Sequence, residues 1–162
     1  MANQVFDEKG LNRLALSLAP VLKAGDSIAL YGELGAGKTT FARSLLRALG
    51  VTEDIPSPTF TLVQSYETAL GQVWHLDLYR LEAAEEAFSL GIEEAFEEVI
   101  TIIEWPERLG GLLPKEALKI ELKFVANPAK REVTIHVTPE WQKRIGSWFD
   151  KLTMSQKNLS SS

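Results

Sequence analysis

Apolar residues in the first third of the chain follow the spacing first of a helix, then of a strand, then of a helix again. After Asp7, five of them share one helix face and predict an amphipathic helix capped by Asp7: Leu11, Leu14, Ala15, Leu18 and Leu22. The short apolar run Ser27–Tyr31 is typical of a buried strand. Helical spacing resumes over Thr40–Leu49, and Gly50 is a suitable place for that helix to end.

The middle of the chain has a hairpin pattern followed by acidic segments. Two prolines within Asp54–Pro58 disfavour a helix there. Thr61–Glu67 and Gln72–Asp77 flank a turn and predict a β-hairpin. Two short acidic helices are then expected, at Ala83–Phe88 and at Ile92–Glu97.

Strand patterns dominate the last part of the chain. Val99–Ile103 is a second buried apolar run, and strands are expected at Ala117–Phe124 and Glu132–Val137 around the loop Ala126–Lys130. Pro139–Leu152 predicts a final amphipathic helix. Helices and strands alternate early and strands cluster later, which favours an α/β fold whose mixed sheet has a parallel core and an antiparallel part.

One domain is expected over residues 1–152, with a polar, frayed tail at 153–162. A length of 162 residues fits a single domain of typical size. The sequence shows no internal repeat and no interdomain linker.

The segment Gly32–Thr39 matches the phosphate-binding pattern G-x-x-x-x-G-K-[ST] at every fixed position. Its glycines allow backbone N–H groups to point at phosphate oxygens, and the helix that follows adds its free N–H groups and the positive end of its dipole. Lys38 is expected to reach the β- and γ-phosphates, and the Thr39 hydroxyl to bind Mg²⁺. A chance match is the alternative, but the loop directly follows a buried strand and opens a helix, which is the context this motif requires.

Three further residues could complete a nucleotide site. Glu104 ends an apolar strand and could hold Mg²⁺, or could simply mark the strand's exit into solvent. Asp77 ends another strand and could accept a proton from attacking water, hold a water, or cap the next turn. Thr59 follows the helix after the loop, as does the Thr that senses the γ-phosphate in GTPases. Trp105 is more often a packing residue, and His75 is interpreted as a structural histidine of its strand.

Composition excludes several classes of protein. The absence of Cys excludes disulfides and thiolate chemistry. No apolar run approaches the roughly 20 residues that span a bilayer, and residues 1–10 do not resemble a secretory signal, so a cytoplasmic protein is expected. The net charge is −5, and seven Glu without Lys or Arg lie between Leu81 and Glu98. Since no basic stripe is present, direct binding of nucleic acid is not expected.

Five motifs occur in order along the chain: G-E-L-G-A-G-K-T-T, S-P-T-F-T-L-V, H-L-D-L-Y-R-L, L-G-I and I-I-E-W-P-E-R. Over about residues 6–137 the chain resembles the TsaE (YjeE) family, the small bacterial ATPases of tRNA threonylcarbamoyladenosine biosynthesis. The resemblance implies a three-layer P-loop NTPase-type fold with a mixed sheet, ATP and Mg²⁺. It also implies action in a complex with TsaD and TsaB, which transfers the threonylcarbamoyl group to N6 of adenosine 37 of tRNA. The chain itself would contact tRNA only indirectly, through that complex. Hydrolysis would be weak until these partners are present.

The resemblance also implies roles for particular residues. The phosphates would be bound by the loop and the start of its helix, namely Leu34, Gly35, Ala36, Gly37, Lys38, Thr39 and Thr40. Thr39 and Glu104 would hold Mg²⁺, while Asp77, Glu104 and Thr59 would act in catalysis. Trp105 would lie beside the nucleotide or a partner, and Glu8 and Arg131 would border the nucleotide. The acidic segment would be either solvated helix faces or a docking surface for a basic partner.

A phosphate loop also occurs in proteins with other functions. A small-molecule kinase shares the phosphate loop but usually needs an Arg-bearing lid, and the segment in that place here is rich in Glu. A GTPase typically carries N-K-x-D, which is absent from the sequence. A nucleotide-gated binding module, in which hydrolysis is incidental, stays open.

Overall fold

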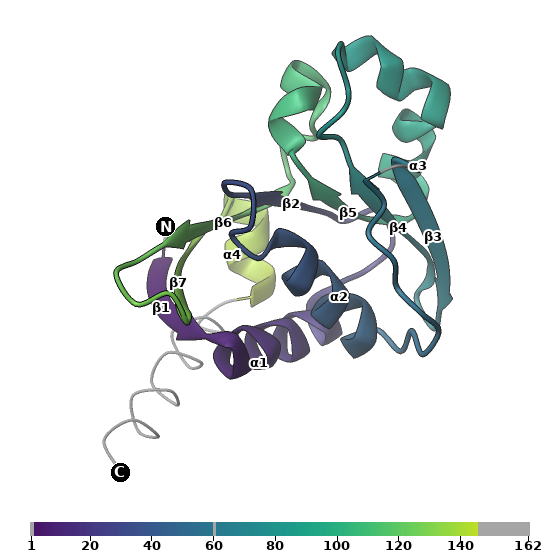
Figure 1. Cartoon of the computed structure of the whole chain (residues 1–162). Helices are drawn as coiled ribbons and strands as arrows, with labels where there is room; N and C mark the ends of the chain where they lie inside the picture. The colour runs from purple at the N-terminus through teal and green to yellow at the C-terminus, as the bar shows by residue number, and fades with distance from the viewer. Residues whose placement is uncertain (1, 60, 146–162) are drawn as a thin grey trace.

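The computed structural model describes residues 2–59 and 61–145 as a seven-stranded mixed sheet between two sets of helices (Figure 1). The strands are β1 (Ala2–Asp7), β2 (Ser27–Tyr31), β3 (Val63–Thr68), β4 (Gly71–Asp77), β5 (Ile100–Glu104), β6 (Leu118–Phe124) and β7 (Lys130–His136). The helices are α1 (Glu8–Leu18), α2 (Lys38–Ala48), α3 (Ile92–Glu98) and α4 (Pro139–Ile145). Three 3₁₀ segments, η1 (Ala19–Val21), η2 (Ala84–Leu90) and η3 (Pro106–Leu112), complete the described elements.

The strand order is β1-β7-β6-β2-β5-β4-β3. The four central strands, from β6 to β4, run parallel, and antiparallel pairs extend the sheet on both sides. The predicted combination of a parallel core with antiparallel strands is therefore confirmed. Because β2 and β5 are central and buried on both faces, their sequences are near-continuous apolar runs.

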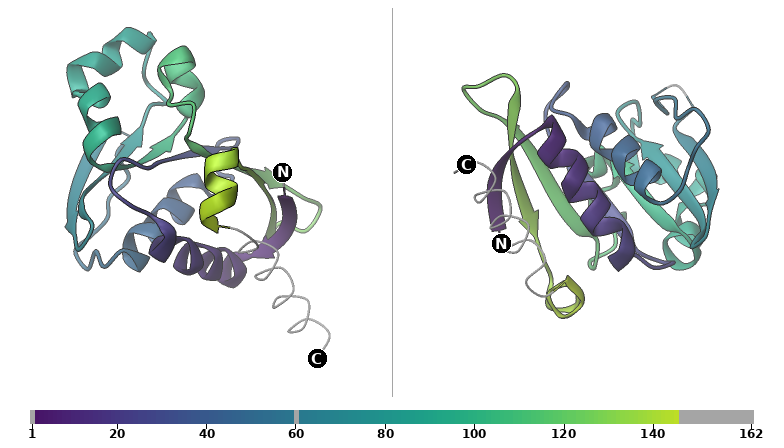
Figure 2. Two further views of the ribbon diagram at one scale, coloured as in Figure 1. Left: turned by 180° about the vertical axis from the view of Figure 1, so that it is seen from behind. Right: turned by 90° about the horizontal axis from the view of Figure 1, so that it is seen from below.

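Side chains alternate between the two faces of the sheet, and each face has its own core. On one face, Ile28, Leu30 and Ile102 pack with the apolar side of α1 and α2. On the other face, Leu76 and Ile103 pack with residues of η2, α3 and η3. Figure 2 shows these two helical layers from behind and from below. The three-layer arrangement follows from the period of two along each strand.

The predicted elements are found within a few residues of their expected bounds. Asp7 caps α1 as expected, since its Oδ1 accepts the Gly10 N–H at 2.7 Å. The hairpin turn is tighter than expected, with the strands extending to Thr68 and Gly71. The first acidic helix is a 3₁₀ segment, η2. Residues 146–152 of the last expected helix and the tail at 153–162 lie outside the described residues.

Two elements were not predicted. β1 has a short, weakly alternating sequence, and pairing with β7 in the register Phe6↔Arg131 makes it a strand. η3 follows Trp105, which has a φ of 59°. The edge position of β1 brings the start of α1 beside the β6–β7 end of the sheet, which matters for the site.

Candidate functional site

The glycine-rich loop lies at the carboxyl end of β2 and leads into α2 (Figure 1). Gly37 has a φ of 107°, which suits glycine, and it serves as the N-cap residue of α2. At Gly32, a Cβ atom would lie only 2.8 Å from the Leu122 carbonyl oxygen. The glycines are thus required both for the curl of the loop and for its close approach to β6.

Lys38 folds back over the loop that precedes it. Its ammonium group donates to the carbonyl oxygens of Gly32 and Glu33, the latter at 3.0 Å. The Nζ atom also lies 3.9 Å from the centre of the Trp105 ring, a cation–π distance. Only 5% of Lys38 is exposed, and burial lowers the pKa of its ammonium group, while the charges of Glu104, Glu107 and Asp77 oppose that shift. A buried cation at the start of a helix is arranged to receive an anion.

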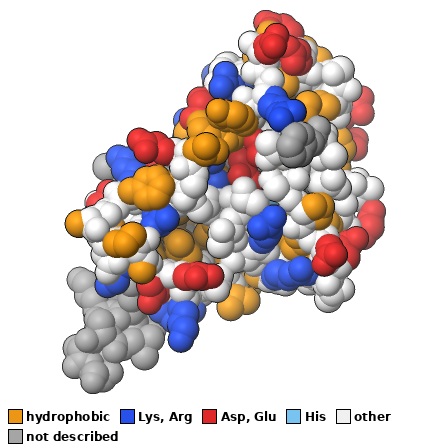
Figure 3. Space-filling view, in the orientation of Figure 1, with side chains coloured by type: hydrophobic (Ala, Val, Ile, Leu, Met, Phe, Trp, Pro, Cys, Tyr) orange, Lys and Arg blue, Asp and Glu red, His pale blue; other side chains and the backbone are white. Residues whose placement is uncertain are grey.

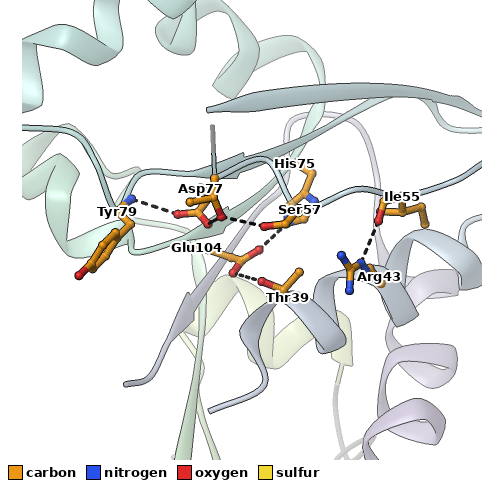
Figure 4. A network of polar contacts seen from close by, with 9 residues as sticks. Thr39, Arg43, Ile55, Ser57, His75, Asp77, Tyr79 and Glu104 are labelled. Atoms are coloured by element: carbon orange, nitrogen blue, oxygen red, sulfur yellow. Dashed lines mark hydrogen bonds and ion pairs between the residues drawn. The ribbon is translucent and has the colours of Figure 1, made fainter. Parts of the chain in front are cut away.

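Glu104 lies beside the loop with both carboxylate oxygens engaged (Figure 4). Thr39 Oγ1 donates to Oε1 at 2.6 Å, and His75 Nε2 lies 2.6 Å from Oε2. Glu104 is 2% exposed, so it does not simply leave the strand for solvent. The two residues expected to hold Mg²⁺, Thr39 and Glu104, are therefore in direct contact.

Asp77 lies next to Glu104, because β4 and β5 are parallel neighbours in the register Asp77↔Glu104. Its Oδ2 accepts the Thr59 hydroxyl at 2.8 Å, and its Oδ1 accepts the Tyr79 N–H at 3.0 Å. The second bond caps the turn after β4, which is one of the alternatives that the sequence left open for Asp77. The structure thus brings Thr59, Asp77 and Glu104 together at one edge of the sheet.

The segment that carries Thr59 is held to α2 by an arginine. Arg43 Nε donates to the Ile55 carbonyl oxygen at 2.8 Å (Figure 4), and Ser57 Oγ lies 2.8 Å from Thr59 Oγ1. Two prolines keep this stretch extended between these contacts, as its sequence indicated. Arg43 is one of the site-supporting residues that sequence reasoning missed, since an exposed Arg on a helix carries no motif.

A pocket of about 200 Å³ opens between these groups. Its lining combines the loop with the three acidic or hydroxyl positions: Leu34, Gly35, Gly37, Lys38, Thr39, Thr40, Thr59, Asp77, Glu104 and Trp105. In the space-filling view, acidic side chains show within a hollow on this face, and hydrophobic side chains gather beside it (Figure 3). Of the described residues that line this pocket, Lys38 is the single Lys or Arg, so an anion entering it would meet one cation and the N–H groups of the loop.

A second pocket, of about 570 Å³, adjoins the other side of the loop. Glu8, from the start of α1, and Arg131, from β7, both line it together with Gly35, Ala36 and Thr40. Arg131 Nε donates to the Ala36 carbonyl oxygen at 3.1 Å, so β7 braces the loop directly. Glu8 and Arg131, which the resemblance implied would border the nucleotide, thus lie beside the loop on the side away from Asp77.

The acidic groups suit a hard divalent cation that brings further ligands with it. Among the residues that the structure describes, no group of three or more His, Cys, Asp or Glu could hold a metal by itself. Mg²⁺ commonly uses one or two carboxylates and completes its shell with water and substrate phosphates. The Thr39–Glu104 pair beside an anion-receptive loop fits that pattern, and zinc or iron sites, which need more protein ligands, do not fit it.

The comparisons with known proteins agree on one family. The model of the family described as "Threonylcarbamoyl adenosine biosynthesis protein TsaE" matches residues 5–133. The chain belongs to the TsaE family. A TsaE protein of Rickettsia bellii is 40% identical over 119 residues, which are 73% of this chain and 83% of that protein. A TsaE protein of Bacillus subtilis is 36% identical over 129 residues, 79% of this chain and 78% of that protein.

A solved structure supports the same assignment. The crystal structure of YdiB from Bacillus subtilis superposes with a TM-score of 0.76 at 26% sequence identity, covering 96% of this chain and 95% of that one. The resemblance inferred from the five motifs is confirmed. As a TsaE family member, this chain functions in the biosynthesis of tRNA threonylcarbamoyladenosine. No helix in the described ranges is long and apolar enough to cross a membrane.

Proposed function

We propose that this TsaE family chain binds ATP with Mg²⁺ in the pocket of Lys38 and Glu104, and hydrolyses it slowly until protein partners join it. One observation carries the proposal. A buried ammonium group, a hydroxyl–carboxylate pair and a second carboxylate meet where a glycine-rich loop opens a helix. Each is a part that phosphoryl-transfer sites use, namely a phosphate cradle, a cation site and a group that orients the nucleophile.

In this proposal, the loop from Leu34 to Thr40 wraps the phosphates. The ammonium group of Lys38 exchanges its carbonyl partners for phosphate oxygens. Thr39 and Glu104 hold Mg²⁺, which would neutralise charge on the phosphates. The base and ribose extend into the second pocket, toward Glu8 and Arg131, because that pocket shares Gly35, Gly37 and Thr40 with the first.

In this proposal, Asp77 is the residue that positions or deprotonates the attacking water. With Oδ1 fixed by the Tyr79 N–H and Oδ2 by Thr59, its carboxylate has a defined orientation beside Glu104. It would hold a water for attack on the γ-phosphorus, either as a hydrogen-bond acceptor or as a base. Thr59 lies on a segment tied down by Arg43, and it would report whether that segment has closed on the nucleotide.

The partners we propose are the TsaD and TsaB proteins, with tRNA met through that complex. Two features of the surface support a protein partner. Leu34 is 73% exposed and Tyr79 44% exposed, and both lie close to the site, Leu34 in its lining and Tyr79 against the Trp105 ring. Exposed apolar side chains beside a functional pocket are typical of an interaction surface. The four Glu of α3 are also exposed, which suits a basic partner.

The test is hydrolysis of ATP with Mg²⁺ by the purified chain, alone and with the TsaD–TsaB pair. Slow turnover that rises many-fold with the pair is expected. Asp77→Asn and Glu104→Gln should keep measurable nucleotide binding but lose the stimulated turnover. Normal turnover in both variants would remove these residues from the mechanism, and phosphate transfer to a small metabolite in place of water would favour a kinase.

The docking surface is tested separately. Reversal of the exposed α3 charges, at Glu93, Glu94, Glu97 and Glu98, to Lys should weaken complex formation measured by analytical ultracentrifugation. The same reversal should leave ATP binding by the isolated chain unchanged, since α3 lies on the opposite face of the sheet from α2. An unaltered complex would place the partner elsewhere.

A further inference from the structure

His75 is fully buried on β4, and its ring points at Glu104 in the candidate cation site (Figure 4). Its Nε2 atom lies 2.6 Å from Glu104 Oε2. Val73, two residues earlier on the same face, packs in the core with α1 and α2. The sequence pattern gave His75 a structural role, whereas the structure sets it behind the carboxylate that faces Thr39.

The contact determines which ring nitrogen carries hydrogen toward Glu104. A carboxylate oxygen accepts, so Nε2 must donate. The other ring nitrogen, Nδ1, is buried and has no hydrogen-bond partner among the described residues. A buried polar atom left unpaired is costly, and such atoms are rare in folded proteins. Leu or Phe would fill this space without an unpaired nitrogen atom, so packing does not explain a histidine here. The bond to Glu104 explains it better.

The bonds form one chain across three elements. His75 on β4 donates to Oε2 of Glu104 on β5, and Oε1 of the same carboxylate accepts the hydroxyl hydrogen of Thr39 on α2. Because Thr39 gives its hydrogen to Glu104, the lone pairs of its oxygen stay available to a cation. Without His75, the Glu104 side chain would be free to rotate about its terminal bond, and the Thr39 hydroxyl would lose its fixed acceptor.

We propose that His75 is a positioning residue that orients Glu104, and through it Thr39, for binding of the divalent cation. The inference rests on the proposed Mg²⁺–nucleotide function of the site. Hydrogen-bonded groups behind metal ligands typically change metal affinity by about 10- to 100-fold when they are removed. His75 would therefore act on cation affinity much more than on the contacts that Lys38 and the loop make with phosphate.

The test compares two replacements of similar polarity. In His75→Gln, the amide nitrogen can reach the place of Nε2, whereas in His75→Asn the side chain is one carbon shorter and the amide falls short of Glu104. The probe is Mn²⁺, whose binding is followed by electron paramagnetic resonance with a non-hydrolysable ATP analogue. Nucleotide affinity is measured in parallel in EDTA. His136→Asn is the matched control, because His136 is also a strand histidine near a glutamate, Glu121 at 3.3 Å.

His75→Asn is expected to weaken Mn²⁺ binding by about 10- to 100-fold, with nucleotide affinity in EDTA within twofold of wild type. His75→Gln should recover most of the loss, and His136→Asn should change neither. Wild-type Mn²⁺ affinity in His75→Asn would overturn the inference while leaving the proposed function intact. Failure of the wild-type chain to bind Mn²⁺ with the nucleotide would overturn both.

A measurement on the wild-type chain keeps the inference testable even if the variants do not fold. In ¹⁵N-histidine nuclear magnetic resonance spectra, His75 should show hydrogen on Nε2, protected from exchange with solvent. Addition of Mg²⁺ to the nucleotide complex should shift the His75 resonances and leave those of His136 in place. A His75 ring with no hydrogen on Nε2, or one unaffected by Mg²⁺, would overturn the inference.

Discussion

Replacement of Lys38 by Met gives the sharpest test of the phosphate site. The unbranched Met side chain keeps most of the packing of the Lys stem and removes the ammonium group. In the free protein that group is bonded to the carbonyl oxygens of Gly32 and Glu33 and lies over the Trp105 ring. In the proposed ATP complex, it would exchange neutral carbonyl partners for charged phosphate oxygens, so the gain would be the difference between the two sets of bonds.

The size of the effect follows from that exchange. A hydrogen bond to a charged group contributes about 1.5–3 kcal/mol net. At about 1.4 kcal/mol for each factor of ten, the loss is about 10- to 150-fold in ATP affinity. The structure places Lys38 at 5% exposure, which favours the upper end of this range because water screens a buried contact less than an exposed one.

Isothermal titration calorimetry with ATP and Mg²⁺ measures the change. Lys119→Met, at an exposed position on β6, is the control for loss of one positive charge and should stay within twofold of wild type. Urea unfolding should show Lys38→Met to be at least as stable as wild type, because burial disfavours the charged form of Lys38. An ATP affinity within twofold of wild type in a folded Lys38→Met protein would refute the assignment of the phosphate site.

Three further predictions concern stability. Tyr66→Phe should raise the free energy of unfolding in urea by about 1 kcal/mol, because the Tyr66 hydroxyl is buried without a hydrogen-bond partner among the described residues; a destabilised variant would mean that the hydroxyl is bonded. Asp26→Asn should lower the free energy of unfolding by about 2 kcal/mol, and the melting temperature with it. The reason is that Asp26 accepts two hydrogen bonds from Arg144, at 2.8 and 2.7 Å, and thereby holds α4. An unchanged melting temperature would contradict this prediction. Burial, together with the charges of Glu107 and Glu121, raises the pKa of Tyr31 above 10.0, so the contribution of Tyr31 to stability is complete below pH 10.0 and is lost as the pH rises further. Tyr31→Phe should therefore reduce the decline of the free energy of unfolding in urea between pH 9 and 11. Equal slopes in the two proteins would refute this prediction.

Much of the fold could be predicted because its pattern is local. A strand buried on both faces must be continuously apolar, and β2 and β5 were found on that basis. Helix spacing and the Asp7 cap located α1. β1 and η3 escaped prediction, because β1 becomes a strand only through pairing with β7, and η3 has neither a long apolar period nor a side-chain cap.

The loop motif also carried the candidate site, since its chemistry depends on eight consecutive residues. Glycines that curl the backbone, a lysine and a hydroxyl at fixed positions specify a phosphate cradle wherever a strand leads into a helix. Asp77 and Glu104, each at the end of a predicted strand, were candidates to complete that site. The sequence alone left open whether each faces the loop or solvent.

Only the tertiary structure decided how the distant residues combine. The parallel register of β4 and β5 sets Asp77 beside Glu104, and it puts the His75 ring within hydrogen-bond reach of that carboxylate. The pairing of β1 with β7 brings Glu8 and Arg131 to the same side of the loop. By itself, the sequence determined the phosphate loop and the elements other than β1 and η3, because those depend on neighbours along the chain. The contacts of His75, Arg43 and Arg131 were decided by strand order and packing, which no local pattern specifies.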